Sequence, residues 1–286
     1  MKAILLTIIF SISIFHLSAQ TSSDIYLFDI QMNNNSMKLI NGKNLTAREG
    51  YDNQPHFVDD RALLYTSQRD GQTDIYAYDF VQNTAGNLTR TPNTSEYSAT
   101  VTSDKDFIST IMVEEDGTQR LWKFPITGGT PTLVLDDIKP VGYHAWYNEK
   151  LALFVLGRPA TLQVANALTQ EVSTITGNIG RCLAPIPASG KISFVHKEAG
   201  KPWMIKSLDM NSMEITEIIE TLEGSEDYAW AGANRIIMAK DTKVYECVLD
   251  GDKNWKEIAD LSEFGITKLS RIAIDKTLKR LAIVGE

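Results

Sequence analysis

The chain has 286 residues, a net charge of −8 at pH 7 and a hydrophobic fraction of 43%, which is ordinary for a globular protein. An acidic chain without a basic run lacks the electrostatic footprint of a nucleic-acid-binding protein. The same charge balance argues against binding to an anionic membrane surface. Composition therefore excludes two classes of partner before any motif is considered.

Residues 1–19 have the pattern of a secretory signal peptide. Lys2 supplies the positive end, residues 3–17 form an apolar segment, and Leu17-Ser18-Ala19 has the small residues of a cleavage site. The apolar segment is short for a membrane-spanning helix, which needs about 20 residues. We expect cleavage to leave one exported domain over residues 20–286, in the periplasm or outside the cell, as a monomer without membrane insertion.

One pattern recurs along the rest of the chain. In its clearest copy an apolar strand ends in the turn Asp59-Asp60, a second strand spans residues 62–67, and the turn Arg69-Asp70-Gly71 leads into a third strand at 74–79. Each copy is anchored on an apolar residue that precedes a polar turn. The anchors are Phe57, Val101, Trp146, Ile186, Trp230 and Ile274. Successive anchors lie 44, 45, 40, 44 and 44 residues apart.

This spacing predicts the fold class. A period of roughly 40–45 residues with four short strands per unit is typical of propeller blades. The sequence therefore predicts an all-β, six-bladed β-propeller of four-stranded blades. A copy of the third strand, residues 24–29, stands at the N-terminus, whereas the last unit ends after its second strand, residues 281–286. We expect the two ends to pair in one blade, because this closes the ring and removes exposed sheet edges.

Two other features are expected to be structural. Asn44-Leu45-Thr46 and Asn87-Leu88-Thr89 match the glycosylation pattern, but they recur at the same place in two units, which favours a role in the fold. Cys182 and Cys247 fall on strands of different blades and are expected to be free thiols. A disulfide is the alternative in an exported protein.

The first units resemble a known repeat. Leu45-Thr46, Gln54-Pro55, Arg69-Asp70-Gly71 and Asp74-Ile75-Tyr76 are similar to the WD40-like repeat of TolB-type β-propellers, most specifically over residues 44–122. The resemblance implies a six-bladed ring. TolB proteins also carry an N-terminal α/β domain that helps to dock partners, and we expect this chain to lack it, because the ring takes up residues 20–286. The repeat also forms the propeller of dipeptidyl peptidase IV-like enzymes, but this sequence contains no G-x-S-x-G motif.

Histidine offers little material for a metal site. Beyond the leader there are His56, His144 and His196, and none has another histidine or cysteine at metal-ligand spacing. His56 and His144 are expected at a similar level of two inner strands in adjacent blades, with His144 beside the channel. Oligogalacturonate lyases resemble this scaffold and use channel-facing metal ligands. A polysaccharide lyase or hydrolase is therefore one alternative, although no cofactor, metal ligand or catalytic residue is predicted.

Residues just before the anchors are expected to gather at one mouth of the channel. They mix aromatic, amide and charged groups on a rigid ring, where binding sites usually occur. The candidate ligand-binding residues are Asn53, Gln54, Tyr97, Tyr143, His144, Arg181, Asp227, Tyr228 and Arg271. The alternative is a solvated entrance without a ligand. The sequence favours a non-enzymatic binding or scaffold propeller for a protein, peptide or glycan, with a TolB-like envelope component as a further alternative.

Overall fold

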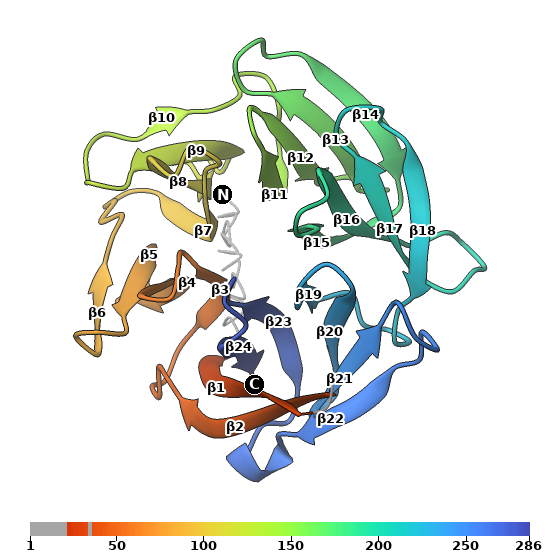
Figure 1. Ribbon diagram of the computed structural model, residues 1–286. Helices are drawn as coiled ribbons and strands as arrows, with labels where there is room; N and C mark the ends of the chain where they lie inside the picture. The colour runs from red at the N-terminus through yellow and green to blue at the C-terminus, as the bar shows by residue number, and fades with distance from the viewer. Residues whose placement is uncertain (1–21, 34–35) are drawn as a thin grey trace, which may run out of the picture.

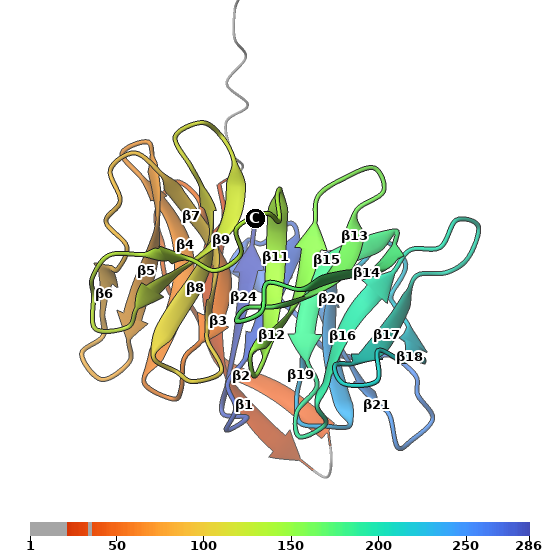
Figure 2. The same ribbon diagram turned by 90° about the horizontal axis from the view of Figure 1, so that it is seen from above.

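The computed structural model describes residues 22–33 and 36–286, so the predicted signal peptide at 1–19 lies outside the described residues. The described part contains 24 strands and one short 3₁₀ helix, arranged in six four-stranded antiparallel sheets. Figure 1 shows the sheets as blades around a central axis, and Figure 2 shows their strands running between the two faces of the ring. The predicted all-β, six-bladed propeller is confirmed.

In each of the first three blades, the strands follow one another in chain order from the channel outwards. Blade 1 contains β3 (Asp52–Phe57), β4 (Ala62–Arg69), β5 (Gln72–Asp79) and β6 (Thr84–Asn87). Blade 2 contains β7 (Ser95–Val101), β8 (Phe107–Val113), β9 (Gln119–Pro125) and β10 (Thr132–Leu133). Blade 3 contains β11 (Val141–Tyr147), β12 (Lys150–Val155), β13 (Thr161–Asn166) and β14 (Val172–Gly177).

Blades 4 and 5 follow the same order, and blade 6 combines strands from both ends of the chain. Blade 4 contains β15 (Ile179–Pro185), β16 (Lys191–His196), β17 (Met204–Asp209) and β18 (Ile215–Glu220). Blade 5 contains β19 (Tyr228–Trp230), β20 (Arg235–Lys240), β21 (Lys243–Val248) and β22 (Lys256–Asp260), and the helix η1 (Ser262–Phe264) follows it. Blade 6 contains β23 (Leu269–Ile274), β24 (Arg280–Gly285), β1 (Asp24–Asn33) and β2 (Ser36–Asn44).

Blade 6 joins the two ends of the chain. β1 pairs with β24 in an antiparallel register that runs from Asp24 opposite Gly285 to Asp29 opposite Arg280 (Figure 1). Its middle residues 25–28 are buried. The predicted closure is therefore confirmed, and neither β1 nor β24 is left as an exposed edge.

The hydrophobic core lies in layers between neighbouring blades. Between blades 2 and 3, Ile111 and Leu121 pack in one cluster with Leu151 and Leu153. The second strands of the blades are covered on both faces, so they are buried along most of their length instead of alternating between buried and exposed residues. β12 is an example, since its last five residues are all buried.

The hairpin β1–β2 also extends over blade 5, and we call it the strap. Glu246 on β21 accepts hydrogen bonds from Ser36 Oγ at 2.9 Å and from the backbone N–H of Met37 at 3.2 Å. Arg235 on β20 donates to the same carboxylate at 2.8 Å, and both side chains of this ion pair are buried. The strap therefore attaches the closing blade to its neighbour through a buried charge. Figure 1 shows the end of β2 beside β22 of blade 5.

The two glycosylation-like segments have the structural role expected of them. Asp24 accepts hydrogen bonds from the side chains of Asn44 and Thr46, both at 2.8 Å. Asp74 receives the equivalent pair from Asn87-Leu88-Thr89, at 2.9 and 3.0 Å. Each Asp thus joins the third strand of a blade to the end of its fourth strand. The two cysteines, on β15 and β21, are free.

Candidate functional site

The innermost strands do not run evenly along the channel. The pairing of β3, β7, β11, β15 and β23 with their second strands is interrupted by a register shift. At three of these places the backbone φ is positive, at 55° for Gln54, 54° for Ser98 and 39° for Arg271. A β-bulge bends its strand and redirects a side chain. All three residues stand three positions before a sequence anchor, so the bulge recurs with the blade period.

Two of these side chains, those of Gln54 and Arg271, meet Tyr143 in the middle of the ring. Arg271 Nη2 donates to the hydroxyl of Tyr143, and Gln54 Nε2 lies 3.5 Å from the same oxygen. β11 and β23 stand on opposite sides of the ring (Figure 1), so the contact between Tyr143 and Arg271 spans the channel. The Arg271 guanidinium also lies 5.2 Å from the Tyr143 ring centre. The mouth of the channel is therefore crossed by a polar network.

Asp227 extends this network to a fourth and fifth blade. Arg271 Nη1 donates to its carboxylate at 2.8 Å, and Arg181 Nε donates from the other side at 3.1 Å. Burial raises the pKa of Asp227 against the opposing charge of Arg181. The ionised carboxylate consequently depends on its arginine partners. We call Gln54, Tyr143, Arg181, Asp227 and Arg271 the mouth cluster.

The rim of the mouth cluster carries more positive than negative groups. Glu226 accepts a hydrogen bond from the backbone N–H of Arg181 at 3.0 Å and forms an ion pair with Lys197 at 2.7 Å. The ion pairs at this rim therefore contain three cations and two carboxylates, although the protein as a whole is acidic. The cations are Arg181, Lys197 and Arg271, and the carboxylates are Glu226 and Asp227. The Arg181 side chain remains 36% exposed, so an incoming group can reach it.

Two predicted site residues lie between blades instead of in the channel. His144 is buried, and its Nε2 lies 2.8 Å from Thr100 Oγ1 and 2.7 Å from Ser109 Oγ of blade 2. Tyr228 is also buried and donates to Ser193 Oγ of blade 4 at 2.7 Å. Both side chains therefore stabilise the contact between their own blade and the preceding blade.

The physical reason is the alternation of side chains along a strand. Successive residues point to opposite faces, so Tyr143 and His144 cannot both enter the channel. Asp227 precedes β19, whereas Tyr228 is the first residue of β19 and contacts blade 4. The predicted list took both members of each pair, and the structure brings only the first of each into the mouth cluster.

The remaining predicted residues also lie outside the mouth cluster. Asn53 is buried and its Nδ2 lies 3.3 Å from Ser23 Oγ, while the Tyr97 hydroxyl lies 3.5 Å from Thr73 Oγ1. His56 belongs to β3 in blade 1. Since blade 2 separates it from His144, the expectation of two histidines in adjacent blades is wrong.

Lowering the pH from about 7 to about 5 is expected to destabilise the fold. Burial lowers the pKa of His56 to about 4 and that of His144 to about 3, against about 6.5 in an unfolded chain. Between these pH values the unfolded chain binds more protons than the folded protein does. The free energy of unfolding therefore decreases as the pH is lowered, by about 1–2 kcal/mol for each histidine. Urea unfolding at both pH values measures the change.

His144→Gln should reduce this pH dependence by roughly half. An unaltered dependence would show that burial of His144 is not its source.

Potential metal ligands do not cluster in the described part of the chain. Within residues 22–33 and 36–286, no three His, Cys, Asp or Glu side chains lie close enough to hold a metal ion. Among these same residues, no helix has the length and apolar character needed to cross a bilayer.

Comparisons with known proteins bear on the fold. No protein-family model and no curated protein matches the sequence. A putative TolB from Agrobacterium tumefaciens superposes with a TM-score of 0.72 and 15% identity, over 93% of this chain and 99% of that one. TolB from Acinetobacter baumannii gives 0.62 and 11% identity, over 91% of this chain but only 64% of that one. A chain of a nidogen/laminin complex gives 0.62 and 12% identity, over 92% and 98%. The protein therefore has the six-bladed β-propeller fold of the TolB proteins.

Proposed function

We propose that this protein is an exported, non-enzymatic propeller that binds a protein, peptide or glycan at the mouth of its channel. The observation that carries the proposal is the convergence of five polar side chains from five blades in the mouth cluster. Because hydrogen bonds and ion pairs already hold these groups in place, a ligand would bind them with little ordering cost.

The side chains at the rim of the mouth cluster narrow the class of ligand that would bind there. The side chain of Arg181 is partly exposed, and its guanidinium, whose Nε and Nη2 pair with Asp227, can also donate to a carboxylate or to the carbonyl groups of a loop. Tyr143 and Gln54 offer neutral polar groups beside it. A ligand segment that presents both acidic and neutral polar groups would match this rim.

A TolB-like component of the cell envelope is the second candidate. The likeness to a TolB structure over nearly the whole length of both chains favours it. In this reading the partner is another envelope protein, and the protein acts in the periplasm. The two candidates share the mouth as the binding site and differ in the partner that it takes.

Arg181→Gln is expected to weaken ligand binding by about tenfold, in the range found for an arginine at the centre of an interface. Asp227 keeps its second arginine partner in this variant, so the ring should remain folded. The measurement is quantitative mass spectrometry of molecules that are crosslinked to the tagged protein in its own source and then purified.

Arg61→Gln provides the matched control. Arg61 is exposed in the turn between β3 and β4, at the opposite end of β3 from Gln54, and the substitution removes the same charge. The control should retain the partners of the unaltered protein. If Arg181→Gln retains them equally well, the mouth is not the binding site.

A further inference from the structure

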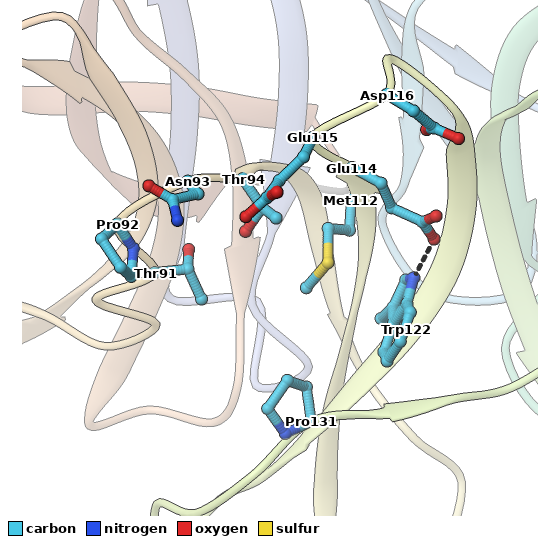
Figure 3. Close-up of a pocket in the computed structure, with 10 residues that line it drawn as sticks. All are labelled: Thr91, Pro92, Asn93, Thr94, Met112, Glu114, Glu115, Asp116, Trp122 and Pro131. Atoms are coloured by element: carbon cyan, nitrogen blue, oxygen red, sulfur yellow. Dashed lines mark hydrogen bonds between the residues drawn. The ribbon is translucent and has the colours of Figure 1, made fainter.

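A groove of about 520 Å³ lies on the flank of blade 2 and shares no lining residue with the mouth cluster. One wall is the loop of residues 91–94 before β7, and the other is the hairpin between β8 and β9 (Figure 3). We call it the blade 2 groove and define it by Thr94, Met112, Glu114, Glu115, Trp122 and Pro131.

The groove adjoins the outer part of blade 2, whose fourth strand is very short. β10 contains only Thr132–Leu133, and it pairs with Trp122 and Lys123 alone of the seven residues of β9. The rest of β9 therefore has no fourth strand beside it. Met112, Trp122 and Pro131 form the apolar floor of the groove (Figure 3), and Trp122 is one of the two residues of β9 that pair with β10.

Both walls are fixed from within. Buried Glu96 accepts hydrogen bonds from Thr91 and from Thr94 Oγ1, the latter at 2.7 Å, and so holds the loop. On the hairpin side, Glu114 accepts hydrogen bonds from Trp122 Nε1 at 2.7 Å and from Arg120 Nε at 2.8 Å. The indole is thereby held in one orientation. A preformed groove of this kind loses little entropy when it binds a ligand.

The charges beside the blade 2 groove indicate which kind of partner it would bind. Three carboxylates follow one another at residues 114–116, and Arg120 neutralises only Glu114. Asp116 is engaged with the backbone of its own turn, accepting from Thr118 N at 2.8 Å. Glu115 has no hydrogen bond or ion pair with any described residue, and Figure 3 shows it directed from the hairpin towards the facing loop. An apolar floor beneath an unpaired carboxylate is complementary to a cationic side chain with a long aliphatic stem.

We propose that the blade 2 groove binds an extended segment of a partner protein that contains lysine or arginine next to apolar residues. The apolar side chains lie on Met112, Trp122 and Pro131, and the cationic group pairs with Glu115. This surface is separate from the mouth cluster, so the protein would hold two partners, or two parts of one partner, at the same time.

The test uses a short capped peptide of lysine, leucine and proline, and the same peptide with glutamate in place of lysine. Binding is followed by NMR on the full chain, with methionine methyl groups labelled and the indole N–H of Trp122 observed. The lysine peptide should shift the Met112 and Trp122 signals in a saturable way. Glu115→Gln should weaken its affinity about two- to fivefold, and Glu115→Lys by at least about tenfold.

Glu263→Lys is the control, because Glu263 is an exposed glutamate in η1 and its replacement changes the net charge equally. It should leave the affinity within about twofold. Three results would overturn the proposal: equal binding of the glutamate peptide, no shift of Met112 by the lysine peptide, or binding of a neutral oligosaccharide at these signals without binding of the lysine peptide. An unchanged Arg181→Gln variant in this assay would show that the groove acts independently of the mouth.

Discussion

Deletion of residues 23–30 is expected to unfold the whole ring, and not only blade 6. It removes the part of β1 that pairs with β24, and with it the buried side chains of Ile25, Leu27 and Phe28. Burial of side chains of this size contributes about 1.5–3 kcal/mol each, or about 5–9 kcal/mol together. A domain has only about 5–15 kcal/mol of net stability. Urea unfolding followed by circular dichroism should show no folded baseline for the deleted chain.

A permuted chain is the control for this deletion. Since Asp24 pairs with Gly285, residues 22–46 can follow Glu286 through a short glycine linker, with the new N-terminus at Ala47. All four strands of blade 6 then occur in sequence, and the permuted chain should unfold cooperatively near the midpoint of the unaltered protein. A deleted chain that is as stable as the intact one would contradict closure of the ring by its two ends.

Glu246→Gln is expected to lower the free energy of unfolding by about 3–5 kcal/mol, the cost of removing one partner from a buried ion pair. The side chains of Arg235 and Glu246 are only 5% and 4% exposed. The substitution also weakens the hydrogen bonds that the carboxylate accepts from Ser36 and Met37. The strap would then detach from blade 5. Chemical denaturation of the purified variant measures the loss.

Glu257→Gln tests whether burial is the cause. Glu257 pairs with Lys243 on the same blade, but these side chains are 43% and 39% exposed. An exposed pair contributes about 1 kcal/mol or less. The double variant Arg235→Met with Glu246→Leu should recover most of the loss, because an apolar pair can replace a buried ion pair. Equal losses for Glu246→Gln and Glu257→Gln would contradict the structural role of the strap.

The repeat was predictable because the apolar runs and polar turns of each blade are local in sequence. Of the six anchors, Phe57, Val101, Trp146, Trp230 and Ile274 lie on innermost strands, and Ile186 follows the end of β15 directly. The closing blade could be predicted for the same reason, since its two halves carry the ordinary pattern of third and second strands.

The strap could not be predicted from local patterns. Ser36 and Glu246 are 210 residues apart, and no periodicity relates a hairpin end to the third strand of another blade. The positive φ of Gln54 and Arg271 could not be predicted from the sequence either, because neither residue is a glycine. The recurrence of polar residues three positions before an anchor is the signal that would have found the bulges.

The mouth cluster was predicted as a region, and its members could be separated only with the structure. All five of its residues were among the candidates, because the blade period places them at one level of the ring. The period alone does not say which of two successive residues faces the channel. His144 and Tyr228 were therefore included, although their side chains lie between blades.

Native mass spectrometry of the mature protein purified from its own source, with metal analysis of the same sample, tests binding at the channel mouth most directly. We expect a protein without a stoichiometric metal that retains a protein, peptide or glycan, and that retains much less of it when Arg181 is replaced by glutamine. A stoichiometric metal together with cleavage of a polysaccharide would contradict the non-enzymatic function. A bound partner that Arg181→Gln does not release would contradict the site.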